Sequence, residues 1–169
     1  IWASTIPYKF EKGIEEERNN HRMYYTVTKD FETFSETKLF LDPGFSVIDA
    51  VIVKRGHKDY VLVLKDNTRP ERDIKVAFSD SPHGPWHDVS DAFSEQFTEG
   101  PTVVKVGDEF LVYYDAYRKK TYDASKTSDF IHFTDASAEV SIPEGHKHGT
   151  IFIGDRKTLD GLLYREKSL

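Results

Sequence analysis

An approximate repeat of about 50 residues is the feature that most constrains the fold of this chain. Three segments resemble one another: each has a short alternating strand pattern, then Ser or Thr close before an Asp, then an aromatic residue. The aspartates that anchor them are Asp30, Asp80 and Asp129, which lie 50 and 49 residues apart. A regular repeat of this length indicates that one supersecondary unit is stacked several times.

Hairpin patterns precede two of these segments. Residues 47–66 and 97–116 each have two runs rich in β-branched and aromatic residues, separated by a turn that contains Gly. A third copy of the hairpin is predicted to start at His148, and residues 1–10 fit the second strand of another hairpin. Four short strands in about 50 residues are typical of a β-propeller blade.

The predicted fold is therefore all-β, a partial β-propeller of about three blades, each a four-stranded antiparallel sheet. We expect one domain over 1–169, with blade segments of about 1–44, 45–94, 95–145 and 146–169. Because propellers close with four to eight blades, the chain is expected to be the C-terminal part of one. A missing N-terminal segment, a companion chain or self-association would complete the ring.

Two other folds were weighed against the propeller. A β-sandwich also uses short strands and frequent turns, but the regular spacing favours blades. A helical solenoid is disfavoured because a 3.6-residue pattern is nowhere sustained. The one candidate helix, residues 11–20, is interpreted as a charged surface loop with a helical turn.

Composition narrows the class of partner. A net charge of −6 argues against nucleic acid or an anionic membrane, and leaves neutral ligands such as carbohydrate. No apolar run approaches the roughly 20 residues that a membrane span needs. The chain has no Cys, which excludes disulfides, thiolate metal sites and Cys nucleophiles.

Three ionisable residues recur at one position of the repeat. Asp49, Glu99 and His148 are 50 and 49 residues apart, and each precedes an apolar run. The first strands of propeller blades line the central channel, so these side chains are expected to converge on its axis. The alternatives are a turn residue or a solvated strand end for each carboxylate, and an exposed or hydrogen-bonded histidine.

The chemistry of a glycosidase fits two carboxylates at such a place. A Glu against apolar walls and a second carboxylate has a raised pKa, through desolvation and like-charge repulsion. Glu99 is thus predicted to keep its proton near neutral pH, as a general acid must. Gly100 and Pro101 are expected to fix the backbone that aims it.

At these residues the sequence resembles glycoside hydrolase family 43, five-bladed propellers that include arabinofuranosidases, xylosidases and arabinanases. The resemblance extends from about Trp2 to Leu163. It rests on VIDA (47–50), TEGP (98–101), HG (148–149) and the blade motifs TKDFETFS and SDSPHGPW. Ala50 stands where the family often has Pro, and a tryptophan motif usual on the second blade is absent, which loosens the subfamily assignment.

The resemblance implies a role for each channel residue. Glu99 would be the general acid, Asp49 would raise the pKa of the acid and orient it, and His148 would lie near the axis and bind a water or a calcium ion. The family's general base lies on the first blade, which would precede Ile1. No cofactor is required, although the central channel could hold a structural calcium ion. The isolated chain is expected to be inactive without its base.

The resulting hypothesis is an inverting glycosidase for arabinose- or xylose-containing plant polysaccharide or oligosaccharide, for which a secreted or periplasmic location is favoured. Candidate substrate contacts are Phe45, Lys65, Asp66 and Arg69, with a solvated loop as the alternative. Trp86 is expected to pack between blades. The competing functions are a non-catalytic carbohydrate-binding propeller, and a scaffold propeller whose inner polar residues hold a channel water.

Overall fold

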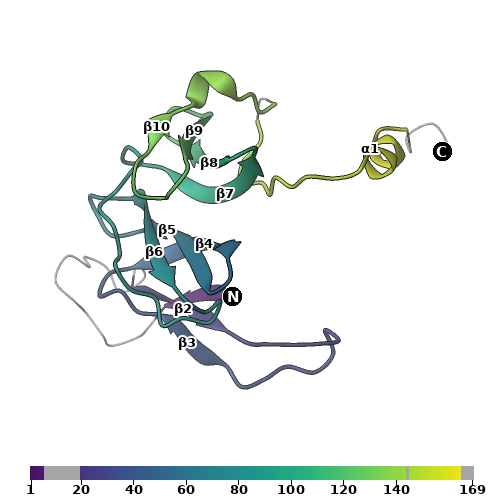
Figure 1. Cartoon of the computed structure of the whole chain (residues 1–169). Helices are drawn as coiled ribbons and strands as arrows, with labels where there is room; N and C mark the ends of the chain where they lie inside the picture. Colours follow the sequence, from purple (N-terminus) through teal and green to yellow (C-terminus); the bar gives the residue numbers. More distant parts are fainter. Residues whose placement is uncertain (6–19, 144, 165–169) are drawn as a thin grey trace.

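The computed structural model describes residues 1–5, 20–143 and 145–164 of the chain. These residues form three antiparallel sheets that lie side by side in an arc (Figure 1). The prediction of an all-β fold built from successive propeller-like blades is confirmed. The predicted charged loop at 11–20 lies outside the described residues, apart from its last residue.

Each sheet is a meander in which strands adjacent in sequence pair. The first has the order β1-β2-β3, with β1 at Trp2–Thr5, β2 at His21–Tyr25 and β3 at Lys38–Leu41. The second has the order β4-β5-β6, with bounds Val47–Gly56, Asp59–Asp66 and Asp73–Ser79. In this sheet a fourth strand is reduced to one bridge between Phe78 and His87.

The third sheet is a complete four-stranded blade. Its order is β10-β9-β8-β7, with β7 at Glu99–Val106, β8 at Glu109–Ala116, β9 at Thr121–Thr127 and β10 at Thr134–Asp135. A single 3₁₀ turn, Ser137–Glu139, follows. The predicted hairpins at 47–66 and 97–116 are therefore β4-β5 and β7-β8.

Apolar side chains between neighbouring sheets form the core. One cluster joins β5 and β6 to β8 through Val61, Val63, Val76, Val112 and their neighbours. A second cluster joins β2 and β3 to β4 and β5 through Met23, Phe40, Val47 and Leu62, among others. Since each cluster takes side chains from two sheets, each blade completes its core only against the next blade.

Trp86 packs between blades as predicted. Its ring is 5.5 Å from that of Phe40 in an edge-on arrangement, and it packs against the cluster that joins the first two sheets. The preceding residues Ser81–Gly84 turn back on themselves, because the Gly84 N–H donates to the Ser81 carbonyl at 3.1 Å.

Two of the three repeated aspartates, Asp30 and Asp129, are turn residues. Asp129 Oδ1 accepts from the backbone N–H groups of Ile131 and His132, both at 2.8 Å. Asp30 Oδ1 makes the equivalent bonds to Glu32 and Thr33 at 2.9 and 2.8 Å. These backbone bonds hold the pKa of both carboxyls well below the usual range, so both are fixed as structural anions.

The predicted third hairpin is wrong. Residues 151–155 form no strand, and Arg156–Leu163 forms the helix α1, which stands apart from the sheets at the end of an extended segment (Figure 1). Asp155 caps the helix by accepting from the Thr158 N–H at 2.7 Å. No described strand pairs with this segment. The helix cap at Asp155 therefore determines its structure, rather than the strand pattern of the repeat. The helix is also too short and polar to span a membrane, as is every helix in the described part of the chain.

Leu62→Ala tests the packing between the first two sheets. Leu62 is fully buried in the cluster that joins them, so the substitution leaves a cavity and should lower the free energy of unfolding by about 2–5 kcal/mol. Urea unfolding measures this loss. Leu39→Ala is the control, because Leu39 on β3 is 53% exposed and its truncation should cost under about 1 kcal/mol. Equal losses in the two variants would contradict the assignment.

Candidate active site

The first strands of the second and third sheets begin with the same irregularity. In β4 the pairing jumps from Ile48 opposite Lys65 to Val51 opposite Val63. In β7 it jumps from Glu99 opposite Asp115 to Thr102 opposite Tyr113. Each jump places two residues in a β-bulge, a device that redirects side chains near functional sites.

This pairing corrects the predicted register by one residue. Asp49 corresponds to Gly100 rather than to Glu99, and both have a positive φ, 47° and 58°. His148 has the same conformation, with φ 43°. Asp49 and His148 therefore project from the left-handed residue of their segments, whereas Glu99 projects from the residue before it. A sequence alignment without the bulge could not reveal this offset.

The three predicted channel residues nevertheless come together. Glu99 Oε1 lies 3.1 Å from His148 Nε2, and Asp49 Oδ2 accepts a 3.1 Å hydrogen bond from the Gly100 N–H. One ligand atom from each of Asp49, Glu99 and His148 lies within 4.8 Å of the others. The strand ends of two sheets and the segment that follows the third sheet thus converge on one point.

Lys65 completes the site. Its ammonium group donates to Glu99 Oε2 at 2.7 Å, and the side chain is 1% exposed. The ammonium lies at the end of β5, one blade before Glu99, so the ion pair links two sheets. Lys65 was a candidate substrate contact in the sequence. The structure places its ammonium group against the candidate acid, and a contact with substrate stays a prediction.

An open pocket of about 380 Å³ lies beside Asp49 and His148. It is lined by Asp49, Ala50, Gly100, Pro101, His148, Gly149 and Thr150. Gly100 allows the segments to approach closely, because a Cβ built there would lie 2.9 Å from the His148 ring. Glycine is therefore required both by the positive φ and by this contact.

The expected raised pKa of Glu99 is wrong. Desolvation raises the pKa, but the hydrogen bonds and charges of Lys65 and His148 outweigh it, so the pKa of Glu99 lies below its ordinary value. Apolar surroundings and a second carboxylate would raise the pKa of Glu99, and both can be expected from the sequence. The buried Lys65 cannot, because nothing in the order of residues shows that the end of β5 faces the start of β7.

Asp115 is a neighbour of the site that sequence reasoning missed. It pairs with Glu99 across β7 and β8, and it is buried. Burial raises the pKa of Asp115, with the charges of Lys147 and Glu99 acting in opposite directions. The signal that could have revealed it is the repeat itself, because Asp115 occupies in β8 the position that Lys65 occupies in β5.

The other predicted substrate contacts lie elsewhere. Asp66 is buried, and its oxygens accept from Lys75 Nζ at 2.8 Å and from the Thr68 N–H at 2.9 Å. Lys75 Nζ also lies 4.9 Å from the centre of the Phe45 ring. Arg69 lines a separate pocket near the start of β7.

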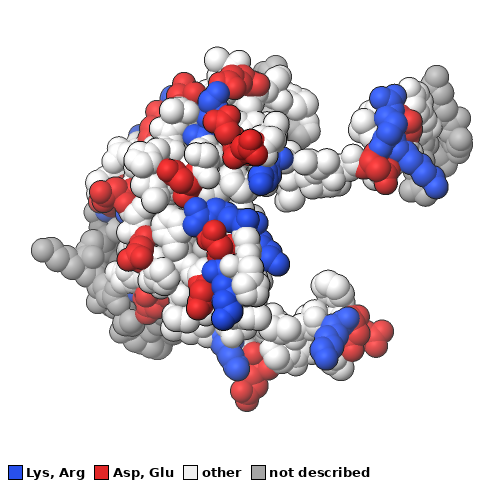
Figure 2. Space-filling view, in the orientation of Figure 1, with Lys and Arg blue, Asp and Glu red and all other residues white. Residues whose placement is uncertain are grey.

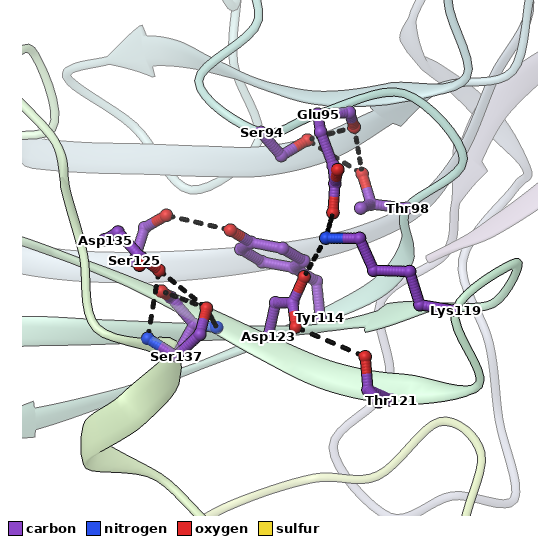
Figure 3. Close-up of polar contacts among 11 residues, drawn as sticks. Ser94, Glu95, Thr98, Tyr114, Lys119, Thr121, Asp123, Ser125, Asp135 and Ser137 are labelled. Carbon is purple, nitrogen blue, oxygen red and sulfur yellow. Dashed lines mark hydrogen bonds and ion pairs between the residues drawn. The ribbon is translucent and has the colours of Figure 1, made fainter.

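A further polar cluster joins β8 and β9 to the segment before β7 (Figure 3). Lys119 bridges Glu95 and Asp123, while the Tyr114 hydroxyl lies 3.0 Å from Ser125 Oγ. These groups line a pocket of about 350 Å³. Because the cationic group is already paired with two carboxylates, the cluster is best understood as fixing the segment before β7 onto the third sheet.

Lys65→Met tests the electrostatics of the site. The ammonium group lowers the pKa of Glu99, whereas desolvation raises it. Without the ammonium group the pKa of Glu99 should therefore rise. Carboxyl ¹³C NMR over a pH titration measures it. Lys54→Met, an equal charge change at an exposed position of β4, is the control. An unchanged Glu99 titration in Lys65→Met would contradict the ion pair.

The ion pair between Lys65 and Glu99 also makes the free energy of unfolding depend on pH. The folded-state pKa of Glu99 is depressed, so the stabilisation is present above the unfolded-state pKa of about 4.3 and is lost as pH falls through the folded value. The destabilisation of Lys65→Met relative to the native protein should therefore shrink in acid.

Gly100→Ala tests the close approach of His148. The added methyl group must adopt a left-handed conformation, at a cost of about 1–2 kcal/mol, and it must also displace the imidazole. Gly107→Ala is the matched control, since Gly107 has φ 62° but open space around its Cβ position. Both variants should lose stability in urea, and Gly100→Ala alone should shift the NMR resonances of His148. Unshifted resonances would contradict the contact.

A comparison with known protein families identifies the family of the chain. The family described as "Probable glycosyl hydrolase domain", related to glycoside hydrolase family 43, has a model that matches residues 1–158. A search of curated proteins found no match. The family match covers all three sheets and the segment that carries His148. The chain belongs to this family of probable glycosyl hydrolase domains related to glycoside hydrolase family 43.

Proposed function

We propose that the protein is a glycosidase whose proton donor is Glu99, acting with inversion on arabinose- or xylose-containing glycans. The observation that carries the proposal is the convergence of Glu99, Asp49 and His148 beside an open pocket, in a chain of a glycosyl hydrolase family. Glu99 is 24% exposed, so its carboxyl can be reached from solvent while much of it is shielded. The sugar specificity rests on the resemblance to family 43.

The depressed pKa of Glu99 has a consequence for the reaction. A general acid acts only when protonated, and kcat/KM reports the free enzyme. If Glu99 is the acid, kcat/KM should fall as pH rises through the low pKa of the free protein, which gives an acidic optimum. A bound sugar would displace water from the pocket and strengthen the desolvation that already raises the pKa, so the corresponding limb of kcat should lie at higher pH.

Asp49 is proposed as a positioning residue. Its carboxylate accepts from the Gly100 N–H and thus holds the backbone next to Glu99. The nearest atoms of Asp49 and Glu99 are within 4.8 Å, whereas the carboxyls of inverting enzymes are about 6.5–9.5 Å apart to admit a water. Asp49 is therefore too close to serve as the inverting base. We propose that the base is a carboxylate outside the described residues.

Calcium held directly by these side chains fits poorly. Ca²⁺ takes about six to eight oxygen ligands, whereas this trio supplies two carboxylates and one imidazole nitrogen. Both Glu99 oxygens already accept from Lys65 and His148, and the Lys65 ammonium supplies the positive charge. We therefore derive no step through a metal ion, and we propose that His148 acts as a hydrogen-bond partner of Glu99.

A non-catalytic carbohydrate-binding propeller is the second candidate. The observation that favours it is the same depressed pKa, because an ionised Glu99 held by Lys65 and His148 is a good acceptor for sugar hydroxyl groups. This function requires glycan binding without turnover.

The exposed side of the first sheet supports the proposal that another blade completes the ring. Phe31 and Phe130 occupy equivalent places beside the repeated aspartates, and both have positive φ, 59° and 62°. Phe130 is 1% exposed between two sheets, whereas Phe31 is 85% exposed. A further blade packed against the first sheet would cover Phe31 as the second sheet covers Phe130.

Glu99→Gln in the complete protein is the test of the function. The amide keeps the size of the side chain but cannot donate the proton, so hydrolysis of a substrate with a poor leaving group should fall about 10²–10⁴-fold. A substrate with a good leaving group should lose much less, since it needs little protonation. Glu109→Gln, an exposed glutamate at the start of β8, is the control and should keep full activity.

The outcomes separate the two candidates. Full activity of Glu99→Gln on the poor leaving group would exclude Glu99 as the acid. Glycan binding by the native protein without turnover would favour the binding function. Product stereochemistry, measured by NMR, supplies an additional check: retention of the anomeric configuration would contradict inversion and point to Asp49 as a nucleophile.

A further inference from the structure

A third pocket, of about 450 Å³, opens beside the candidate active site. Cationic and aromatic side chains dominate its lining, which consists of Arg69, Pro70, Arg72, Phe97, Tyr117 and Arg118. Three of these six residues are arginines, in a chain whose net charge is −6. On the face seen in Figure 2, by contrast, acidic and basic side chains are interleaved. We call this site the arginine pocket.

The arginine pocket is joined to Glu99 by direct contacts. Lys65 Nζ is 2.7 Å from Glu99 Oε2 and 5.0 Å from the centre of the Tyr117 ring. The N–H groups of Phe97 and Thr98, which precede Glu99, donate to the Arg72 carbonyl at 2.7 and 3.1 Å. The wall of the pocket and the start of β7 are therefore one connected structure, and a ligand in the pocket would extend towards Glu99.

Two of the guanidinium groups are available to a ligand. Arg118 lies over the Phe97 ring, with its Cζ atom 3.3 Å from the ring centre. A contact of this kind leaves guanidinium N–H groups free to donate. Within the described part of the chain, neither Arg72 nor Arg118 forms an ion pair. The Tyr117 hydroxyl oxygen is also buried there without a hydrogen-bond partner, a state that costs stability until a partner arrives.

The chemistry of this lining selects an anion. Guanidinium groups bind carboxylate and oxyanion groups through paired N–H donors. Among the residues that the structure describes, the lining includes no carboxylate. A neutral sugar would leave Arg72 and Arg118 without the charge partner that such a site is built to bind. A uronic acid carboxylate and a sulfate ester are two substituents that give a sugar unit such a negative charge.

We propose that the arginine pocket binds the anionic substituent of an acidic sugar unit and so positions the neighbouring glycosidic bond at Glu99. The inference rests on the proposed function, because it takes a glycan as the ligand. It narrows the substrate class from neutral arabinose- or xylose-containing glycans to those that carry an acidic unit near the cleaved bond.

Calorimetric titration of the complete protein tests this binding with three probes of equal length. These are a xylo-oligosaccharide with one glucuronic acid unit, the same oligosaccharide with one sulfate ester, and the neutral oligosaccharide. At low salt an acidic probe should bind roughly tenfold or more tightly than the neutral one, and salt should reduce the difference. Arg72→Met and Arg118→Met should each abolish the preference, and Arg118→Lys should retain part of it.

Arg156→Met is the matched control, since Arg156 lies on α1 with its side chain 80% exposed. It removes the same charge and should leave the preference intact. Thermal unfolding of each variant shows that it is folded. Arg118 is the more secure position, because Arg72 has a positive φ of 47° and its carbonyl anchors the start of β7.

The results distinguish this inference from the proposed function. Equal affinity for acidic and neutral probes, or a preference that survives both methionine variants, would overturn the arginine pocket. Tighter binding of the sulfated probe than of the uronic acid probe would support an anion site and would identify sulfate as the group that it binds. If Glu99→Gln hydrolyses normally while Arg118→Met loses the preference, the proposed function fails and the pocket stands.

Discussion

The site depends on one interaction, the ion pair between the buried Lys65 ammonium and the Glu99 carboxylate at 2.7 Å. An ammonium group removed from water in this way is stable only with a nearby anion and satisfied hydrogen bonds. Because Lys65 ends β5 and Glu99 begins β7, the pair ties two blades together at the place where the pocket opens. It also determines the protonation state of Glu99, and with it the acidity at which any proton transfer would occur.

The two bulges at the starts of β4 and β7 give this pair its surroundings. Each turns the inner strand so that a left-handed residue faces the pocket, and the identity of that residue decides its role. At Asp49 the position supplies a carboxylate that accepts from the neighbouring blade. At Gly100 it supplies an N–H and the space into which the His148 ring fits. The two blades thus share one backbone geometry at the bulge, but they carry different residues there, which make different contacts.

Much of the fold could be predicted from the sequence, because strand pattern and turn chemistry are local. The spacing of Asp30, Asp80 and Asp129 indicated blades, and two of these aspartates proved to hold the same turn. The hairpins β4-β5 and β7-β8 followed from alternation and from their Gly-containing turns. The prediction from the repeat was wrong at residues 156–163, where α1 forms. A strand-like sequence forms a strand only where a partner strand pairs with it.

The residues that form the site could be predicted from the sequence better than their charges and pKa values could. Glu99, Asp49 and His148 were found from their spacing, although the bulge moves Glu99 by one residue relative to the other two. The depressed pKa of Glu99 could not be foreseen, because it depends on Lys65 and His148, which are 34 and 49 residues away in sequence. Asp115 was missed for the same reason, since its position opposite Glu99 is set by the pairing of β7 with β8.

The central claim is that Glu99 reaches the bond that is broken. A crystal structure of the complete protein with an uncleavable thio-linked oligosaccharide tests it most directly. The account predicts a Glu99 carboxyl oxygen at about 2.6–3.2 Å from the position of the glycosidic atom, with Asp49 still bound to the Gly100 N–H. A sugar bound elsewhere, with both Glu99 oxygens still held by Lys65 and His148, would contradict it.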